Sequence, residues 1–283
     1  MKKSQSLWFE NLPQGKGGAL RLFSFPYAGG SAQVFRRWQR HFMPQAALSL
    51  AHLPGRAARV GEPPLKRYKP LINALADAII PELPPAFAFW GHSMGAVISF
   101  ELARELRRRG QPAPLALFLS GRGAPQIPDP DPPVFNLPDP EFIAELRRLS
   151  GTPKELLDSP ELKEFFLTTI MADFELVETY EYEPEAPLNC AIHTYGGLQD
   201  TNVPAASLKA WQEQTSGPFK VRMFPGDHFY IHTSADLPHA FRRDVLDLLP
   251  ESSADQQARP QLNFGSMGPR DARREQRFRL WSR

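Results

Sequence analysis

The sequence predicts an α/β protein whose central sheet is mostly parallel and carries helices on its faces. Segments with strand character alternate with segments of helical periodicity along most of the chain. One expected strand, 86–90, is wholly apolar, as a central parallel strand buried on both faces should be. The 283 residues are 42% hydrophobic and 23% charged, which suits a globular domain with a substantial core.

The first part of the chain follows this alternation without interruption. In chain order we expect strand 20–25, helix 32–42, strand 48–53, helix 70–83, strand 86–90, helix 96–109 and strand 115–120. The helix 70–83 has Leu71, Leu75 and Ile79 at helical spacing. The helix 96–109 ends in a basic turn, which suits the negative end of its dipole, and Gly110 follows as a stop.

Residues 122–187 break the alternation and are predicted to be an insertion. A proline-rich stretch is followed by two helical segments, at roughly 140–150 and 160–180. The second has apolar residues on one face, namely Phe165, Phe166, Ile170, Met171 and Phe174. This face could roof a channel or pack on the body. The alternation then resumes with strand 189–195, helix 205–215, strand 219–224 and helix 235–249.

We therefore expect one domain over 1–250 and a disordered tail over 251–283, because the tail is polar and lacks periodicity. The net charge is +2, but the tail holds seven Arg against four acidic residues. This leaves 26 basic and 27 acidic residues in the domain. Such a balance predicts no nucleic-acid partner.

The compartment is indicated by the single cysteine and by the absence of apolar runs. Cys190 cannot form an intrachain disulfide, which is typical of a reducing compartment. The N-terminal lysines are not followed by the apolar segment of a signal peptide, and no run approaches the ~18 apolar residues of a membrane span. We expect a cytoplasmic monomer that does not enter a membrane.

The main chemical signal is the motif Gly91-His92-Ser93-Met94-Gly95, a G-x-S-x-G between an expected strand and an expected helix. In α/β-hydrolase folds this sharp turn strains the serine backbone and exposes the hydroxyl over the carboxyl edge of the sheet. The motif also occurs by chance in loops, but the flanking strand and helix disfavour that interpretation. We predict an α/β-hydrolase fold with Ser93 as nucleophile.

A serine hydroxyl needs a base, and in this fold the acid and then the histidine follow the serine along the chain. Four histidines follow Ser93. His228 lies in the turn after the last expected strand, where active-site loops collect. His193 falls within a strand, His239 falls in the last helix, and His232 could be a neighbour of the site. We predict His228 as the base.

The acid is predicted to be Asp200, which follows the strand 189–195. Its rival, Asp227, is adjacent in sequence to His228, and adjacent side chains diverge in most backbone conformations. We expect Asp227 to cap its own turn instead.

The oxyanion needs two donors. We predict the Met94 amide, directly after the nucleophile, and the Ala28 amide, in the loop after the first clear strand. His92 and His52 are expected to be packed structural residues, and Cys190 a small buried hydrophobe.

Taken together, these motifs resemble those of type II (editing) thioesterases that serve nonribosomal peptide and polyketide synthases. The resemblance covers about residues 7–248 and includes a region where that family carries its lid helices. The matching segments are Phe25-Pro-Tyr-Ala-Gly-Gly30, Leu53-Pro-Gly-Arg56 with Arg59 and Glu62-Pro63, Gly91-His-Ser-Met-Gly-Ala96, Ser120-Gly-Arg122 with Ala124-Pro125, Ala172-Asp-Phe-Glu-Leu-Val-Glu-Thr-Tyr180 and Gly226-Asp-His-Phe229.

The resemblance implies hydrolysis of acyl or aminoacyl thioesters from the phosphopantetheine arm of acyl or peptidyl carrier proteins, which removes aberrant or stalled groups. Ser93, Asp200 and His228 fall at the family's triad positions, and Ala28 and Met94 at its oxyanion amides. No cofactor and no metal are implied, because the arm belongs to the substrate protein.

Other functions remain open. A medium-chain fatty acyl thioesterase or a small-molecule carboxylesterase would use the same residues. A non-catalytic hydrolase-fold binding module is disfavoured by the intact Ser, Asp and His. Four arginines, Arg104, Arg107, Arg108 and Arg109, could meet an acidic carrier protein or form a solvated helix end.

Overall fold

The computed structural model describes residues 7–13, 15, 19–129, 131–149, 158 and 160–249, and for 160–165 it describes the backbone alone. The tail 251–283, expected to be disordered, lies outside these residues. The described residues up to Leu249 belong to one compact unit.

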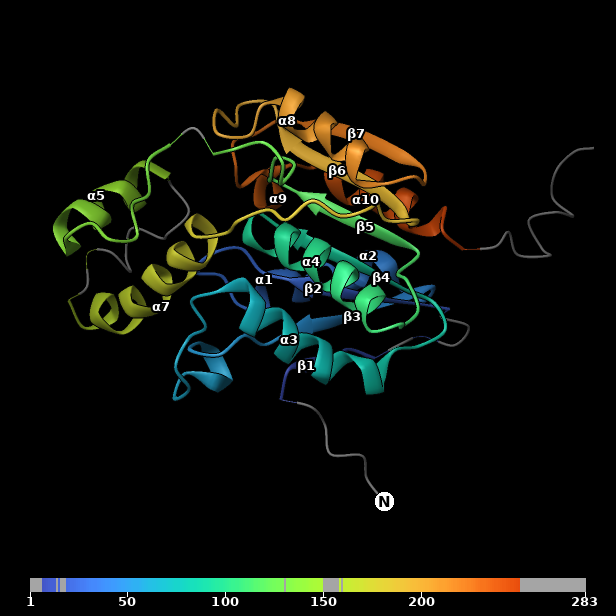
Figure 1. Cartoon of the computed structure of the whole chain (residues 1–283), viewed down its shortest axis with the longest axis horizontal. Helices are drawn as coiled ribbons and strands as arrows, with labels where there is room; N and C mark the ends of the chain where they lie inside the picture. Colours follow the sequence, from blue (N-terminus) through green and yellow to red (C-terminus); the bar gives the residue numbers. More distant parts are fainter. Residues whose placement is uncertain are drawn as a thin grey trace, which may run out of the picture. The chain divides into compact units, whose positions relative to one another are not determined.

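The described residues form one seven-stranded sheet with strand order β1-β3-β2-β4-β5-β6-β7 (Figure 1). The strands are β1 (Phe9–Asn11), β2 (Leu20–Phe25), β3 (Ala46–Ala51), β4 (Phe87–His92), β5 (Ala116–Ser120), β6 (Ala191–Gly197) and β7 (Phe219–Phe224). Every neighbouring pair is parallel except β1 with β3. The predicted, mostly parallel sheet is confirmed. The sequence analysis missed β1, whose three residues are too few to show an alternation.

The helices are α1 (Gln33–Arg36), α2 (Gln39–Phe42), α3 (Tyr68–Ile79), α4 (Met94–Arg108), α5 (Asp139–Leu149), α7 (Pro160–Glu178), α8 (Ala205–Lys209), α9 (Tyr230–Thr233) and α10 (Leu237–Leu246), with 3-10 turns η1 (Ala57–Arg59), η2 (Ile80–Glu82) and η3 (Ala210–Gln214). The expected helix 32–42 is two short helices instead of one. The extended backbone of Ser234 separates α9 from α10. No helix in the described ranges is long and apolar enough to cross a bilayer.

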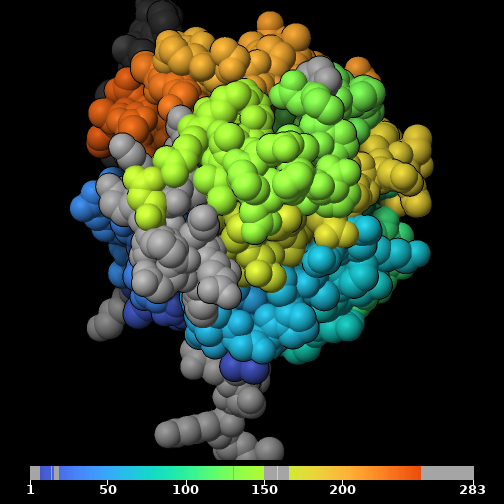
Figure 2. Space-filling view, turned by 90° about the vertical axis from the view of Figure 1, so that its left-hand side faces the viewer, coloured from blue at the N-terminus to red at the C-terminus, as the bar shows by residue number. Residues whose placement is uncertain are grey.

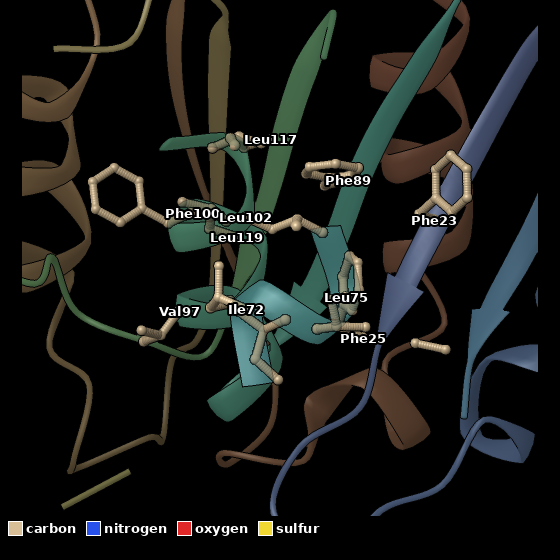
Figure 3. Close-up of a cluster of buried hydrophobic side chains, with 14 of the residues drawn as sticks. Phe23, Phe25, Ile72, Leu75, Phe89, Val97, Phe100, Leu102, Leu117 and Leu119 are labelled. Atoms are coloured by element: carbon tan, nitrogen blue, oxygen red, sulfur yellow. The ribbon is translucent and has the colours of Figure 1, made fainter. Parts of the chain in front are cut away.

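Two layers of helices bury the sheet. On one face, α3, α4 and η3 cover strand residues such as Phe23, Phe89 and Leu119, a cluster shown in Figure 3. On the other face, α1, α2, α9 and α10 surround Trp90 of β4. The Trp90 ring centroid lies 4.4 Å from that of Phe35. Because both faces are packed, the strand ends are rigid platforms for the loops that follow them.

The inserted segment between β5 and β6 has a small core of its own. Helices α5 and α7 lie together beside the sheet in Figure 1, and Figure 2 shows their residues exposed on one face of the molecule. Phe142 of α5 packs on Phe174 of α7 with ring centroids 5.3 Å apart. Phe166, Ile170 and Met171 join the same cluster. The apolar face of α7 therefore packs against α5, whereas the Phe165 side chain lies outside the described residues.

Candidate active site

The predicted site residues all lie in loops at the carboxyl edge of the sheet. Ala28 follows β2, Ser93 and Met94 follow β4, Asp200 follows β6, and His228 follows β7. These four strands run parallel in one sheet, so their carboxyl ends lie along the same edge. The structure thus gathers residues from four loops that are far apart in the sequence.

Ser93 occupies a strained turn between β4 and α4. Its backbone angles are φ 54° and ψ −114°, in a region that residues other than glycine rarely adopt. The Ser93 amide donates to the carbonyl oxygen of Ser120 at the end of β5, at 2.7 Å. This conformation is the one expected of a nucleophile between a strand and a helix.

The two motif glycines allow this turn because the backbones approach closely. An ideal Cβ on Gly91 would stand 1.9 Å from the Gly95 carbonyl oxygen. One on Gly95 would stand 2.0 Å from the Phe25 carbonyl oxygen, on β2. No side chain fits at either position, so the pattern of the motif has a steric cause.

Asp200 and His228 form the acid–imidazole pair expected from their positions. The distance from His228 Nδ1 to Asp200 Oδ2 is 2.7 Å, and the Asp200 side chain is 1% exposed. The other carboxylate oxygen accepts the amides of Asn202 and Val203, at 3.0 and 3.2 Å. With Asp200 ionised, Nδ1 carries the proton and Nε2 is left as the acceptor that a general base needs.

The rival carboxylate has the local role expected of it. Asp227 Oδ1 accepts the Phe229 amide at 2.8 Å and caps its own turn.

The other three histidines after Ser93, all within the described residues, are placed differently. His193 is buried in β6, with Nδ1 3.9 Å from Asp244 Oδ2. His239 is exposed on α10. His232 is a neighbour of the site, since its Nε2 lies 3.0 Å from the Tyr27 hydroxyl. Neither His232 nor His239 has a carboxylate partner among the described residues, which leaves His228 as the paired imidazole at this edge.

The loop 26–30 is held by hydrogen bonds on both sides of Ala28. The Gly30 amide donates to the Tyr27 carbonyl oxygen at 2.9 Å, and the Gly29 amide donates to Asp173 Oδ2 at 2.8 Å. Within the described residues the Ala28 amide itself has no partner. Met94 opens α4, where the first amides have no acceptor inside the helix. Both amides are available, but their role as oxyanion donors stays a prediction.

A buried polar chain lies behind His228. His92 Nδ1 is 2.8 Å from the Ser120 hydroxyl, which is 2.5 Å from the Tyr230 hydroxyl. The His92 and His228 ring centroids are 5.1 Å apart. Burial, and secondarily the nearby His228, hold the pKa of His92 well below its ordinary value, so it stays neutral. His92 is thus a packed residue, as expected, whereas the sequence did not indicate that Ser120 and Tyr230 extend this chain of hydrogen bonds.

Cys190 is buried, also as expected, and burial raises the pKa of its thiol to about 12. It is therefore protonated and unreactive at neutral pH. In the part of the chain that the structure describes, no three His, Cys, Asp or Glu side chains are grouped to hold a metal ion.

The four arginines at the end of α4 are engaged within the molecule. Their acidic partners are Glu101, Glu105, Glu185 and Asp77. The alternative of a solvated helix end does not hold for Arg104, which is only 2% exposed because it bridges α4 to the chain before β6. The charge of this cluster is largely offset internally, which weakens the case for a docking patch here.

The pairing of Arg56 with Asp173 was missed although both residues lie in recognised motifs. The available signal was weak, because Arg56 is the one charged residue in Leu53-Pro-Gly-Arg56, whereas Asp173 shares its motif with Glu175 and Glu178. Their positions, 117 residues apart, gave no indication of contact.

Comparison with known proteins shows to which family the chain belongs. The thioesterase domain family matches residues 20–244. The chain belongs to the thioesterase family. The gramicidin S biosynthesis protein GrsT of Aneurinibacillus migulanus is 43% identical, over 80% of this chain and 89% of GrsT. The linear gramicidin dehydrogenase LgrE of Brevibacillus parabrevis is 42% identical, over 82% and 90% respectively. A rat medium-chain S-acyl fatty acid synthase thioesterase is 32% identical, over 78% and 84%.

Solved structures give the same result. The type II thioesterase BorB from the borrelidin biosynthetic cluster is 33% identical with a TM-score of 0.77, and the match covers 88% of this chain and 100% of BorB. YbtT, a type II thioesterase from the yersiniabactin NRPS/PKS pathway, is 31% identical with a TM-score of 0.76, over 86% and 98%. The expected α/β-hydrolase fold and the resemblance to type II thioesterases are both confirmed.

Proposed function

We propose that the protein is a type II thioesterase that hydrolyses acyl or aminoacyl thioesters on the phosphopantetheine arm of acyl or peptidyl carrier proteins. In this role it clears stalled or aberrant groups from nonribosomal peptide or polyketide synthases. The observation that carries the proposal is the paired Asp200 and His228 at the sheet edge that also bears the strained Ser93. The similarity to type II thioesterases supports the choice of thioesters as substrates.

In the first step, Ser93 Oγ attacks the thioester carbonyl carbon and His228 Nε2 takes the hydroxyl proton. The Asp200 carboxylate stabilises the resulting imidazolium through Nδ1–H. The amides of Ala28 and Met94 donate to the oxyanion. Collapse of the tetrahedral intermediate breaks the C–S bond, and the pantetheine sulfur leaves with the proton from His228. The product is an acyl ester on Ser93.

In the second step, water attacks the acyl ester and gives a proton to His228 Nε2. Collapse breaks the bond to Ser93 Oγ, which recovers a proton from His228, and the free acid leaves. These steps require side chains, backbone amides and water, and the proposal includes no cofactor.

The relative named as a dehydrogenase does not change this proposal. Dinucleotide-binding folds of the Rossmann type use a G-x-G-x-x-G turn after a strand to approach the pyrophosphate. This chain has no G-x-G-x-x-G, and the loop after β2 reads Pro26-Tyr27-Ala28-Gly29-Gly30. We therefore do not extend the dehydrogenase name of LgrE to this protein.

A second candidate is hydrolysis of medium-chain fatty acyl thioesters. It is favoured by the similarity to the rat medium-chain enzyme. The two candidates differ in what they select. A carrier-protein editor should accept many short acyl groups, because one methylene in an apolar pocket changes transition-state binding by only about 1–3 kcal/mol. Its selectivity should come from docking of the carrier protein, remote from the reacting carbonyl.

The test measures hydrolysis of acetyl, propionyl, aminoacyl, octanoyl and dodecanoyl groups on a carrier protein, on coenzyme A and on pantetheine. Intact-protein mass spectrometry follows the carrier protein, and Ser93→Ala is the control. We expect a higher kcat/KM for short groups on the carrier protein than for the same groups on the two small thiols. A strong preference for one long chain would support the fatty acyl candidate. Equal efficiencies on all three carriers would contradict recognition of the carrier protein.

A further inference from the structure

The loop that carries Ala28 depends on a buried ion pair between two distant segments. Arg56, in the loop after β3, and Asp173, on α7, are joined by two hydrogen bonds of 2.6 Å. Their side chains are 8% and 2% exposed. We propose that Asp173 and Arg56 are positioning residues for the oxyanion hole, so that the hole is assembled only while α7 is docked. This inference rests on the proposed function of the site.

Both members of the pair bind the backbone of the loop directly. Asp173 Oδ2 accepts the Gly29 amide at 2.8 Å as well as one arginine nitrogen. Arg56 Nη1 donates to the Gly30 carbonyl oxygen at 3.2 Å. Ile170, also on α7, lies against the same loop, since an ideal Cβ at Gly29 would stand 3.1 Å from its Cγ1. Three side chains from outside the loop therefore determine where Gly29 and Gly30 lie.

The position of these glycines determines the direction of the Ala28 amide. The Tyr27 carbonyl and the Ala28 N–H belong to one planar peptide unit and point in opposite directions. The Gly30 amide holds that carbonyl oxygen at 2.9 Å. Any shift of Gly29 and Gly30 would rotate this peptide and turn the Ala28 N–H away from the developing oxyanion. The ion pair thus acts on catalysis through the backbone and without touching substrate.

Anchoring of α7 alone does not explain the ion pair. The Thr169 hydroxyl donates to the Gly55 carbonyl oxygen at 2.7 Å, and Glu175 pairs with Lys66 and Arg67. These contacts hold α7 without touching the loop 26–30. A buried ion pair is weak evidence for stability, because apolar residues of similar volume often stabilise as well. Apolar side chains could not accept the Gly29 amide, and this is the distinct contribution of Asp173.

The decisive variants separate loop positioning from anchoring. Asp173→Ala removes the acceptor of the Gly29 amide and the partner of Arg56. The double variant Arg56→Asp/Asp173→Arg restores opposite charges, but an arginine on α7 has no atom that can accept the Gly29 amide. Arg56→Lys keeps the charge and loses the two-pronged geometry. Thr169→Val, one turn before Asp173 on α7, is the matched control that removes an anchor outside the loop.

We expect Asp173→Ala and the double variant to lower kcat for acyl-carrier-protein hydrolysis at least tenfold, with KM within twofold, because the hole acts mainly in the transition state. Arg56→Lys should lower kcat severalfold. A boronic acid that forms a tetrahedral adduct should lose affinity in parallel with kcat. Thr169→Val should lower Tm and leave kcat within twofold.

Unchanged kcat in folded Asp173→Ala, or full recovery of kcat in the double variant, would overturn the inference. If Asp173→Ala does not fold, Arg56→Lys becomes the decisive variant. A wild-type kcat in Arg56→Lys would then overturn the inference. Failure of the proposed function is recognised separately, since wild-type protein would then hydrolyse no acyl-carrier protein. A wild-type enzyme that is active, with variants that are equally active, contradicts only the role of the ion pair.

Discussion

The body of the molecule and the inserted segment 122–187 are stabilised in different ways. In the body, large clusters of buried side chains cover both faces of the sheet, and α4 alone buries most of its residues. In the inserted segment, the buried cluster contains five residues, Phe142, Ile143, Leu146, Leu167 and Ile170. Leu176 of α7 is buried in the core cluster of the body, and polar contacts of Asp173 and Thr169 with the loops after β2 and β3 also connect α7 to the body.

This difference separates two tasks of the proposed enzyme. Ser93, Asp200 and His228 are attached to strand ends of the large core, where geometry is held rigidly. The segment with the smaller core lies at the same edge of the sheet, as the contact between Asp173 and the loop after β2 requires (Figure 1). Regions with few buried contacts open at lower free energy. In the proposed enzyme, we therefore expect the inserted segment to move and admit different acyl groups while Ser93, Asp200 and His228 stay in place.

The largest expected effect is that of removing the nucleophile. Ser93→Ala should lower turnover by about a thousandfold or more, as loss of a triad member does in other serine hydrolases. The melting temperature should be unchanged or higher, because the strained turn needs a small residue and not the hydroxyl. Acyl-carrier hydrolysis, fluorophosphonate labelling and thermal denaturation measure the three properties. A variant that keeps more than about 1% of the wild-type rate would exclude Ser93 as nucleophile.

The next effect distinguishes the two aspartates. Asp200→Asn should lower kcat by about three to four orders of magnitude, because an amide cannot hold the imidazole in the required tautomer. Asp227→Asn should change kcat less than about threefold, since an amide oxygen can still accept the Phe229 amide. Single-turnover rates of the two variants provide the measurement. The opposite ranking would transfer the role of acid to Asp227.

Two substitutions that truncate buried phenylalanines test whether the body and the inserted segment unfold separately. Phe100 of α4 and Phe142 of α5 are both buried. Phe100→Ala should lower the free energy of unfolding of the whole domain by about 3–5 kcal/mol. Phe142→Ala should instead increase amide exchange in α5 and α7 and lower the global value by less than about 1.5 kcal/mol, because the segment opens locally. Urea denaturation measures the free energy of unfolding, and hydrogen exchange followed by mass spectrometry measures the local opening of α5 and α7. Equal losses would show that both regions unfold as one unit.

The smallest expected effect is a pH dependence of the free energy of unfolding, caused mainly by His92 in the body of the molecule. Burial, and secondarily His228, lower the pKa of His92 in the folded state, whereas the unfolded chain titrates near the ordinary value of about 6.5. Below that pH the unfolded state binds more protons, so stability decreases as the pH falls from about 7 to 5. His92→Asn should reduce this slope, with His232 and His41, whose pKa values are also lowered, supplying the remainder. An unchanged slope in urea titrations would contradict the assignment to His92.

The body was predictable because its signals are local. Alternating strand and helix patterns indicated β2 to β7, and the strand–turn–helix context of Gly91-His92-Ser93-Met94-Gly95 indicated the strained turn. The order of residues after Ser93, together with their positions after expected strands, predicted the pairing of Asp200 with His228 that the structure shows. In contrast, β1 is only three residues long and exists because it pairs with β3. The split of the helix 32–42 into α1 and α2 was not indicated by periodicity.

By itself the sequence predicted the fold class, which the structure confirms, and it placed Ser93, Asp200 and His228 directly after strands of one sheet, because spacing along the chain governs which residues lie at strand ends. Tertiary structure alone decided which side chains meet from distant segments. The chain of His92, Ser120 and Tyr230 spans three elements, and Asp173 reaches Arg56 and Gly29 across more than a hundred residues. A hydrogen bond requires its donor and acceptor to be placed to within a few tenths of an ångström, and tertiary packing determines that placement.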